Sequence, residues 1–419
     1  MNRHRFWNYG LLALVVLIAT GCMLRSGTDS RTAAAPAQAH PQRAPGMYQP
    51  LAPESATIQQ GIAPQTVAVT QTVKVGLLLP ITGRHAELGK ALQDAAAISL
   101  FDKYARLSPN QQSIRVELIP QDTGDTPRQA AAAAQAALDA GATLLIGPIF
   151  SDATEAVVPV AAARNVPVLS FSNSFARAGK GVYVFGFSPQ EQTARVVRFS
   201  ISSGKLRIAA LIPNSPLGET VRVGMREVLK KAELTPVAEV TYTSQGVDMD
   251  KALTQLVPVE GKPNFDALLV PEGGPALDIM LRALATRGVT PANVQFLGTG
   301  IWDDPMLLHR VNLDGAWFAT SPPQSTAQFL DRFQSTYHYT PPRIASLAYD
   351  AVALAVTLAT SGRPYTNANL VSEAGFLGPA NGIFRLRNSG QVERGLAIVR
   401  IQAGALQVIS PAPETMMGQ

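Results

Sequence analysis

The chain has 419 residues, 46% of them hydrophobic, which is enough apolar material to build a substantial buried core. Lysine and arginine total 35 and aspartate and glutamate total 30, so the formal net charge is only +5. These charges are scattered, with no basic run beyond the pair Lys230–Lys231, which argues against a nucleic-acid-binding surface. The single cysteine, Cys22, leaves no possibility of an internal disulfide.

The first 22 residues have the pattern of a secretory signal. Arg3, His4 and Arg5 precede an apolar run, Leu11–Ala19, which is too short to span a bilayer as a permanent helix. Small residues then lead to Cys22. The pattern resembles the bacterial lipobox, in which the cysteine thiol is acylated and becomes the first residue of the mature protein. Residues 1–22 are therefore predicted to be a lipoprotein signal that leaves a lipid anchor at Cys22.

The next segment, Met23–Thr72, is rich in alanine, proline and glutamine and has few large apolar residues. Such a composition cannot bury enough surface to order itself, so we expect residues 23–72 to form a disordered tether that reaches roughly 35–42 Å. Met23 is not the aspartate associated with retention in the inner membrane. The sequence therefore predicts a protein anchored by lipid to the outer membrane and facing the periplasm.

From Val73 onward, short apolar runs alternate with amphipathic segments. Val73–Pro80 is nearly continuously apolar, as a strand covered on both faces should be. Apolar residues from Leu88 to Ala96 then recur at three- and four-residue steps, which predicts a helix. The same alternation predicts strands at Ile114–Pro120, Thr143–Gly147 and Pro167–Ser170 and helices at Pro127–Ala140 and Asp152–Ala163. This spacing is typical of parallel βαβ units.

The alternation restarts after Tyr183–Phe187. It predicts strands at Ile208–Pro213, Thr235–Tyr242, Phe265–Pro271 and Val294–Gly298 and helices at Gly218–Ala232, Met249–Leu256, Pro275–Arg287, Phe329–Tyr337 and Arg343–Ala359. A hairpin is expected at the end, where Gly382–Arg387 would pair with Gly395–Ile401 through the turn Asn388–Gly390. Two open sheets in series fit this length better than one, so we predict an α/β fold with two doubly wound parallel-sheet lobes.

Five motifs occur in a distinctive order along these elements: Val75–Gly83, Ile146–Ser151, Val166–Ser170, Pro271–Gly274 and Leu347–Val352. In that order and at that spacing they resemble the type I periplasmic-binding-protein fold, and specifically its leucine-binding-protein-like, branched-chain-amino-acid-binding branch. Within that fold, Gly298–Asp304 and the lipoprotein signal look most like the penicillin-binding protein activators. The resemblance covers nearly the whole of the chain from Val73 to about Ile401.

The resemblance implies two lobes that are joined by three crossings of the chain and can close about a hinge. One lobe would hold about residues 73–190 and 320–375. The other would hold about residues 191–319 and 376–405, which leaves 406–419 as a tail.

Ligands of open parallel sheets bind beyond the carboxyl ends of the strands, where loops lead into helix amino termini. Three such loops are Thr82–Arg84, Gly147–Ser151 and Ser170–Ser174. Their hydroxyls, together with backbone N–H groups at a helix start, suit a carboxylate or another anion.

The resemblance places three serines of these loops where amino-acid-binding relatives hold the carboxylate and ammonium groups of the ligand. They are Ser151, Ser172 and Ser174, and we add Ser170 and Asn173 of the same loop as candidate cleft residues. A structural alternative is that Ser151 caps the helix predicted to start at Asp152.

The second lobe departs from the pattern of amino-acid-binding relatives. Those relatives have an aromatic residue before a glycine in the first loop of this lobe, where Leu217 stands here. They also have an acid in the loop matching Gly298–Ile301 that neutralises the ligand's ammonium, and this chain has Thr299 and Gly300 there. Glu272 and Asp303 are the candidate substitutes, because a buried ammonium without a counter-charge costs several kcal/mol.

No motif for catalysis or metal binding is found. The five histidines are dispersed, the one cysteine is assigned to the lipid, and neither a Gly-x-Ser-x-Gly motif nor a phosphate-binding loop is present. We therefore predict a protein that is not an enzyme and has no catalytic residues, metal or cofactor.

Two functions are weighed. The first is a regulatory lipoprotein that binds and activates a penicillin-binding protein in peptidoglycan synthesis, as the family resemblance implies. The alternative is a substrate-binding lipoprotein of an ABC transporter that captures branched-chain or other amino acids or amides.

Overall fold

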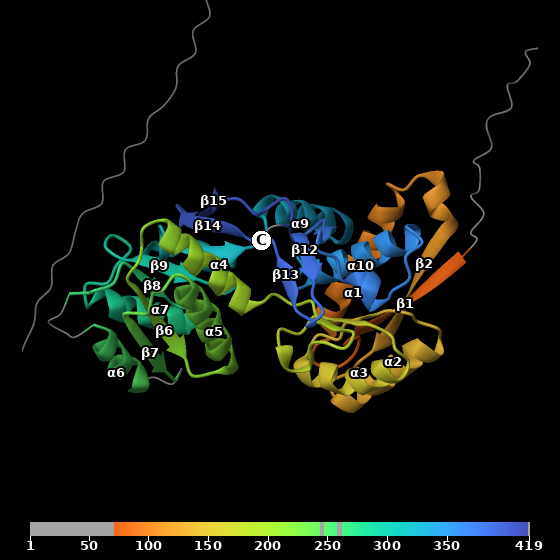
Figure 1. Cartoon of the computed structure of the whole chain (residues 1–419), viewed down its shortest axis with the longest axis horizontal. Coiled ribbons are helices and arrows are strands. Elements are labelled where there is room, and N and C mark those ends of the chain that lie inside the picture. The colour runs from red at the N-terminus through yellow and green to blue at the C-terminus, as the bar shows by residue number, and fades with distance from the viewer. Residues whose placement is uncertain (1–70, 244–246, 258–261, 418–419) are drawn as a thin grey trace, which may run out of the picture. The chain divides into compact units, whose positions relative to one another are not determined.

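The computed structural model describes residues 71–243, 247–257 and 262–417 (Figure 1). The predicted signal, Cys22 and the tether up to residue 70 lie outside the described residues. Gln71 and Thr72, which we had expected to end the tether, are instead the first residues of the first strand. No described helix combines the length and the apolar character needed to cross a bilayer.

The first lobe is built on a five-stranded, fully parallel sheet of order β2-β1-β3-β4-β5. The strands are β1 (Gln71–Leu79), β2 (Ile114–Asp122), β3 (Leu145–Ile146), β4 (Val168–Ser170) and β5 (Val182–Val184). Leu77 and Leu79 of β1 belong to the core on one face of this sheet, and Leu78 belongs to the core on the other. Burial on both faces therefore explains the continuous apolar run of β1.

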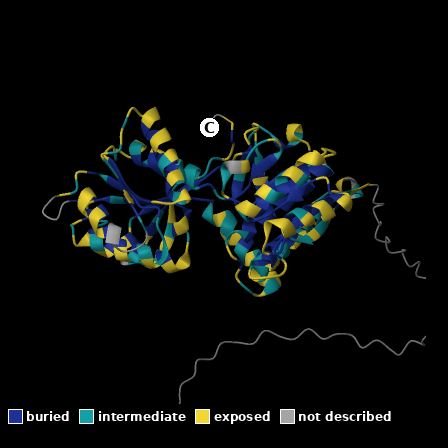
Figure 2. Cartoon of the chain, turned by 90° about the horizontal axis from the view of Figure 1, so that it is seen from below, coloured by how far each residue is buried: buried dark blue, intermediate teal, exposed yellow. Residues whose placement is uncertain are grey.

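Helices cover both faces of the first sheet (Figure 1). On one face lie α1 (Ala86–Tyr104), α9 (Pro323–Tyr337) and α10 (Ala345–Thr360). On the other lie the alanine-rich α2 (Pro127–Asp139) and α3 (Ser151–Ala163). Figure 2 shows the result, with buried residues concentrated in the strands and exposed residues on the outer faces of the helices.

The second lobe is built on a seven-stranded sheet of order β15-β14-β10-β9-β8-β6-β7. Five of its strands are parallel: β6 (Ile208–Pro213), β7 (Ala238–Tyr242), β8 (Ala267–Leu269), β9 (Gln295–Gly298) and β10 (Trp317–Thr320). The last two, β14 (Ala397–Gln402) and β15 (Ala405–Ser410), are antiparallel. Helices α4 (Pro189–Ser202) and α5 (Pro216–Lys231) cover one face, and α6 (Val247–Leu256) and α7 (Gly274–Ala285) cover the other.

Sequence reasoning missed α4 and β10. Helix α4 buries polar Gln192, Thr193 and Ser200 together with Val196 and Val197, so its apolar pattern is thin. Strand β10 has only four residues. The other described elements are short: 3-10 turns at Pro109–Ser113, Phe175–Arg177, Gly300–Trp302 and Val311–Leu313, with α8 (Pro305–Leu308) and α11 (Asn367–Leu370).

The predicted C-terminal hairpin is wrong in its second strand. Gly382–Leu386 forms β12, but it pairs with β13 (Val392–Arg394) and with β11 (Phe376–Gly378) in a separate antiparallel sheet. The turn at residues 388–390 is present, since Gly390 N donates to Arg387 O and Arg387 N to Gln391 O. This short turn places Leu386 opposite Val392, so the pairing ends before Gly395 and the next strand, β14, joins the second sheet.

The small sheet lies with the first lobe, whereas we had expected residues from 376 onward in the second. Phe384, Leu386 and Val392 pack in the same core as α1 and α10. Asp350 of α10 is fully buried and accepts hydrogen bonds from the backbone N–H groups of Ala380 and Asn381. Residues 406–419 were expected to form a tail, but Ala405–Ser410 form strand β15, which pairs along β14.

The chain crosses between the two lobes at three places, as the resemblance implied. The first crossing leads from β5 to α4, the second from β10 to α9, and the third from β13 to β14. These crossings bring Phe187, Thr320 and Arg394 close to the boundary between the lobes.

Candidate functional site

Loops at the carboxyl ends of β1 to β4 line a cavity of about 500 Å³ on the first lobe. Three of them, the loops after β1, β3 and β4, are those that the sequence predicted, because parallel strands end at one edge of the sheet. The loop after β2, residues 123–126, was not predicted. Its polar and charged lining residues are Arg84, His85, Thr123, Asp125, Thr126, Ser151, Asp152, Ser172 and Asn173.

Asp122, at the end of β2, holds the first two loops in place. Its carboxylate accepts hydrogen bonds from the backbone N–H groups of Ile81, Thr82 and Gly124 and from the Thr82 hydroxyl. Partial burial opposes ionisation, but these hydrogen bonds outweigh it and hold the pKa of Asp122 below its usual value. Asp122 is therefore a structural carboxylate of the site.

The loop from β3 to α3 requires glycine at its start. A Cβ on Gly147 would lie 2.2 Å from the carbonyl oxygen of Leu78, and the residue has φ +96°. The helix that follows begins at Ser151, with Phe150 at the N-cap and no side-chain cap. The alternative role of Ser151 as a cap is therefore wrong, and its exposed side chain lines the cavity.

Asp152 changes what the start of α3 can bind. Its carboxylate accepts a hydrogen bond from the N–H of Ala153 at 2.8 Å. That N–H would otherwise face a ligand carboxylate at the helix amino terminus. Asp152 thus occupies one donor and adds a negative charge beside the position expected to hold an anion.

The Ser170–Ser174 loop divides into structural and accessible residues. Ser170 is fully buried, and its hydroxyl contacts the Thr154 hydroxyl at 2.7 Å and the Ser172 N–H at 3.2 Å. Ser172 is also buried and accepts a hydrogen bond from Ser174 N, although it lines the cavity. Asn173 is exposed and lines the cleft, as does Ser174. Of these residues, Asn173 and Ser174 are placed to reach a ligand, and Ser170 is not.

The opposite wall is formed by the start of α5 in the second lobe. A cavity of about 680 Å³ lies between Ser151, Asn173 and Ser174 on one side and Pro216, Leu217, Glu219, Thr220 and Val223 on the other. Its one charged lining residue, Glu219, forms an ion pair with Arg222. Leu217 therefore presents an aliphatic surface where amino-acid-binding relatives are expected to present an aromatic ring.

Glu272 is held inside the second lobe. Its carboxylate accepts hydrogen bonds from the Tyr242 hydroxyl and from Gly273 N, and its carbonyl oxygen accepts one from Trp302 Nε1. Burial, followed by the hydrogen bond to Glu272, raises the pKa of Tyr242 far above its usual value. Glu272 is absent from the lining of the cavities described above. It therefore stabilises the loops of its own lobe.

Asp303 is paired with an arginine from the other lobe. Arg343, just before α10, lies 3.3 Å from the Asp303 carboxylate. The same guanidinium donates to the carbonyl oxygen of Gly300 and to the Thr320 hydroxyl, both at 2.7 Å. The Thr320 hydroxyl in turn donates to Asp303 at 2.6 Å. The candidate counter-charge for a ligand ammonium is thus already neutralised by the protein.

Arg343 also borders a cavity of about 330 Å³ at the edge of the cleft. The cavity is lined by Ile149, Phe171, Asn173, Phe187, Arg343, Ile344 and Leu347. The guanidinium lies 4.4 Å from the centroid of the Phe187 ring, a cation–π contact. Arg343 was not among the predicted site residues, because an arginine before a helix carries no motif. Its polar side-chain contacts are with Gly300, Asp303 and Thr320 of the second lobe, and no sequence pattern shows that these residues lie opposite it.

In the described chain, no group of three or more histidine, cysteine, aspartate or glutamate side chains is arranged to hold a metal ion. The predicted absence of metals and cofactors stays a prediction.

A family model described as periplasmic binding protein matches residues 72–405. The chain belongs to this family. Its α/β fold with two parallel-sheet lobes is the type I, leucine-binding-protein-like fold. Members of the family are substrate-binding proteins, generally not enzymes, and family membership fits a periplasmic location.

Solved structures share this fold at low sequence identity. A protein from Rhodospirillum rubrum assigned to a branched-chain amino acid ABC transporter is 18% identical, with a TM-score of 0.71, over 81% of this chain and 100% of that one. A solute binding protein from Rhodopseudomonas palustris in complex with 3,4-dihydroxybenzoic acid is 19% identical, with a TM-score of 0.59, over 81% and 96%. A Streptococcus pneumoniae protein, LivJ, in complex with isoleucine is 19% identical, with a TM-score of 0.56, over 81% of this chain and 100% of that one.

Among curated proteins, an uncharacterised protein of Rickettsia prowazekii is 23% identical over 157 residues. The match covers 38% of this chain and 40% of that protein. The chain thus matches less than half the length of this relative.

Proposed function

We propose that this chain is a lipid-anchored periplasmic binding protein that regulates peptidoglycan synthesis by binding and activating a penicillin-binding protein. The observation that carries the proposal is the pairing of Asp303 with Arg343. It leaves no free carboxylate among the described residues of the second-lobe wall, where amino-acid-binding relatives are expected to neutralise the ligand's ammonium. That arrangement favours a function other than amino-acid uptake.

The cost of the missing charge favours the regulatory function over amino-acid uptake. An amino acid in a closed cleft brings a desolvated ammonium, which needs a carboxylate partner. Glu219 is bound to Arg222, Glu272 to Tyr242 and Asp303 to Arg343. Freeing Asp303 would leave Arg343 without its ion pair. An amino acid would therefore bind weakly.

The choice of partner rests on sequence. Gly298–Asp304 and the predicted lipobox at Cys22 resemble the penicillin-binding protein activators. A tether of the predicted reach lets an outer-membrane lipoprotein extend its lobes toward an enzyme in the periplasm.

The test combines two measurements on the full chain in detergent. Calorimetric titration with each of the common amino acids is expected to give no binding below millimolar concentration. Affinity purification with a bifunctional penicillin-binding protein is expected to yield a complex, and glycan polymerisation by that enzyme should accelerate when the chain is added. Micromolar binding of an amino acid, with no effect on any such synthase, would refute the proposal.

A second candidate function is supported by the cavity beside Arg343. Its lining combines Phe171 and Phe187 with the Arg343 guanidinium, whose Nε takes no part in the contacts to Gly300, Asp303 and Thr320. Such a lining suits an aromatic carboxylate that has no ammonium group. Three structures of the same fold were solved with benzoate, 4-hydroxybenzoate or 3,4-dihydroxybenzoic acid. In this function the chain is the substrate-binding lipoprotein of an ABC transporter.

The second candidate has its own test. Titration with benzoate and 4-hydroxybenzoate should show binding that is lost in Arg343→Met and retained in the control Arg164→Met. Arg164 is exposed, pairs with Asp139 and lines none of the cavities described above. Leucine should bind neither variant. Benzoate binding unaffected by Arg343→Met would exclude this site.

A further inference from the structure

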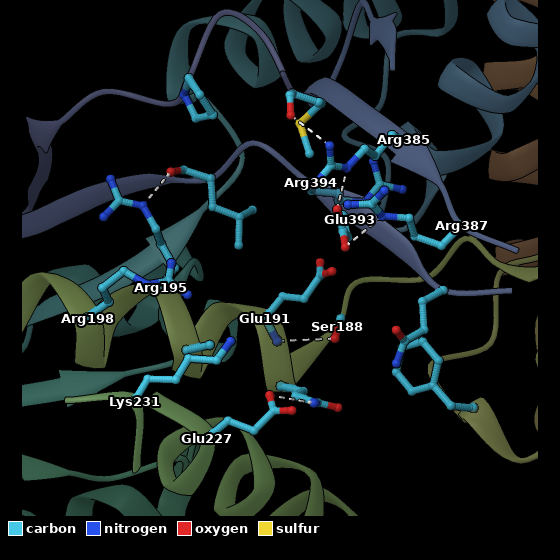
Figure 3. A pocket seen from close by; sticks show the side chains of 17 residues that line it. Ser188, Glu191, Arg195, Arg198, Glu227, Lys231, Arg385, Arg387, Glu393 and Arg394 are labelled. Atoms are coloured by element: carbon cyan, nitrogen blue, oxygen red, sulfur yellow. Dashed lines mark hydrogen bonds and ion pairs between the residues drawn. The ribbon is translucent and has the colours of Figure 1, made fainter. Parts of the chain in front are cut away.

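A separate cavity of about 650 Å³ lies at the hinge (Figure 3). It adjoins the cleft, because Phe175 and Gln190 line both. The second lobe contributes α4 and α5 to its wall, and the small sheet of the first lobe contributes β12 and β13. We call it the hinge cavity; its charged lining residues are Glu191, Arg195, Arg198, Glu227, Lys231, Arg385, Arg387, Glu393 and Arg394.

The hinge cavity has an excess of positive charge. Six of its lining side chains are cationic and three are carboxylates. Glu393 is paired with Arg385 and Arg387, and Glu227 accepts a hydrogen bond from Gln190. No ion pair joins the lining cations of α4 and α5, which are Arg195, Arg198 and Lys231, to a described acidic side chain.

Arg198 and Lys231 are exposed on the second-lobe side and form no ion pair with any described residue. Arg195 donates only to neutral groups, the Leu396 carbonyl oxygen and the Ser410 hydroxyl. Arg195 and Arg198 are three residues apart on α4, so their side chains lie on the same side of the helix. Burial and then the charge of Arg198 lower the pKa of Arg195. Like charges gathered at one wall favour an anion between them.

Arg394 supplies the opposite wall and is itself incompletely satisfied. It is only 8% exposed, and its Nη2 donates to the Phe185 carbonyl oxygen at 2.7 Å. Its Nε and Nη1 are buried and have no hydrogen-bond partner among the described residues. A buried guanidinium N–H without an acceptor is costly, so an acceptor from a ligand would relieve that cost.

Glu191 lies between these cations but does not neutralise them at neutral pH. Burial is the main cause that raises its pKa to about 8, against the opposing charge of Arg394. A carboxyl group that is largely protonated at pH 7 can also donate a hydrogen bond to an anion.

We propose that the hinge cavity binds a small polyanion, a molecule with two or more carboxylate or phosphate groups. Arg198 and Lys231 contact it from the second lobe, and Arg394 contacts it from β13 on the first. Because the ligand touches both lobes, its binding holds them at one angle. This site shares no charged residue with the cleft, and its binding of a polyanion does not require the proposed partner.

The experiment is a calorimetric titration of the full chain at pH 7 and constant ionic strength. Three probes are titrated separately: citrate, which has three carboxylates; pyrophosphate; and acetate, which is a monoanion. Citrate or pyrophosphate should bind at least tenfold more tightly than acetate. The double variant Arg198→Ala/Lys231→Ala should weaken that binding by between about tenfold and a hundredfold, since it removes two charge-assisted contacts that contribute up to about tenfold each.

The matched control is Arg128→Ala/Lys230→Ala. Lys230 is exposed on α5 next to Lys231 but does not line the cavity, and Arg128 is exposed on α2. This control should bind the probes as the parent chain does. Arg394→Met tests the other wall of the cavity and should also weaken binding about tenfold. If this variant does not fold, the result for Arg198→Ala/Lys231→Ala alone tests the site. No binding of either polyanion at 10 mM, or equal losses in both double variants, would overturn the proposal.

Discussion

At the scale of single residues, Arg343 determines most of the character of the cleft. It comes from the first lobe and contacts Gly300, Asp303 and Thr320 of the second. Although burial lowers its pKa, a guanidinium stays charged in proteins, and Asp303 balances that charge. The same contacts that neutralise Asp303 also tie the two lobes together.

Replacing Arg343 with alanine should therefore destabilise the chain. We expect a loss of about 2–4 kcal/mol in the free energy of unfolding, because Asp303 and the Gly300 carbonyl lose a partner in a half-buried position. Denaturant unfolding followed by circular dichroism measures the loss. Arg164→Ala, which removes an exposed ion pair with Asp139, should cost less than about 0.5 kcal/mol. Equal effects of the two substitutions would contradict this role.

Glu191 should make stability depend on pH. The folded chain keeps this proton up to a pKa of about 8, whereas the unfolded chain releases it near 4.5. The folded state thus binds more protons between these values, and stability falls as pH rises from about 5 to 8.

Comparison with Glu191→Gln isolates this effect. The parent chain should lose at least about 1 kcal/mol more than the variant between pH 5 and pH 8, as expected of a shift larger than one pKa unit. Denaturant midpoints at the two pH values give the comparison. Parallel pH profiles would show that Glu191 titrates normally.

At the scale of elements, the start of α5 depends on a close approach between helix and strand. Ser215 caps α5 by accepting a hydrogen bond from Gly218 N. A Cβ on Gly218 would lie only 1.8 Å from the Pro213 carbonyl oxygen at the end of β6. The glycine after Leu217 is thus required by packing and does not by itself indicate a ligand.

Gly218→Ala should displace the start of α5, which forms the second-lobe wall of the cleft. We expect a destabilisation of about 2–3 kcal/mol, since backbone cannot move aside as a side chain can. Gly204→Ala is the comparison, because no atom lies within 4 Å of its Cβ and only the left-handed backbone at φ +82° opposes it, at about 1 kcal/mol. Thermal unfolding ranks the two, and a larger loss at Gly204 would be inconsistent with the packing of α5.

The elements also show where sequence patterns predict well. Strands buried on both faces, such as β1 and β6, were predicted within a few residues because they are nearly continuous apolar runs. The long helix α10 was predicted equally well because its apolar residues recur with helical periodicity. Helix α4 was missed because it buries polar side chains. The partner predicted for β12 was wrong, because the short turn pairs β12 with β13 and the neighbouring sheet takes up β14.

At the scale of the whole molecule, function is proposed to depend on anchoring as well as on the lobes. Sequence alone predicts a lipidated cysteine at residue 22 and a polar segment between it and β1. The family confirms a periplasmic binding protein fold from residue 72 onward, but the anchor is a proposal.

Cys22→Ala tests the anchor. In cells, we expect the chain to move from the membrane fraction to the soluble fraction and to lose labelling by a fatty-acid precursor, because acylation requires the thiol. Met23→Asp should stay membrane-bound and labelled but shift to the inner membrane. Unchanged labelling of Cys22→Ala would rule out lipidation at this residue.

The sequence by itself determined the α/β class, the two lobes and the loops of the first lobe that face the cleft. These follow from local periodicity and from the rule that parallel strands end at one edge. Only the tertiary structure decided that Ser170 is internally bonded, that Asp303 is bound to Arg343 and that Arg394 lines a hinge cavity. Those properties depend on contacts between residues far apart in the chain, and local patterns carry no information about which charges meet.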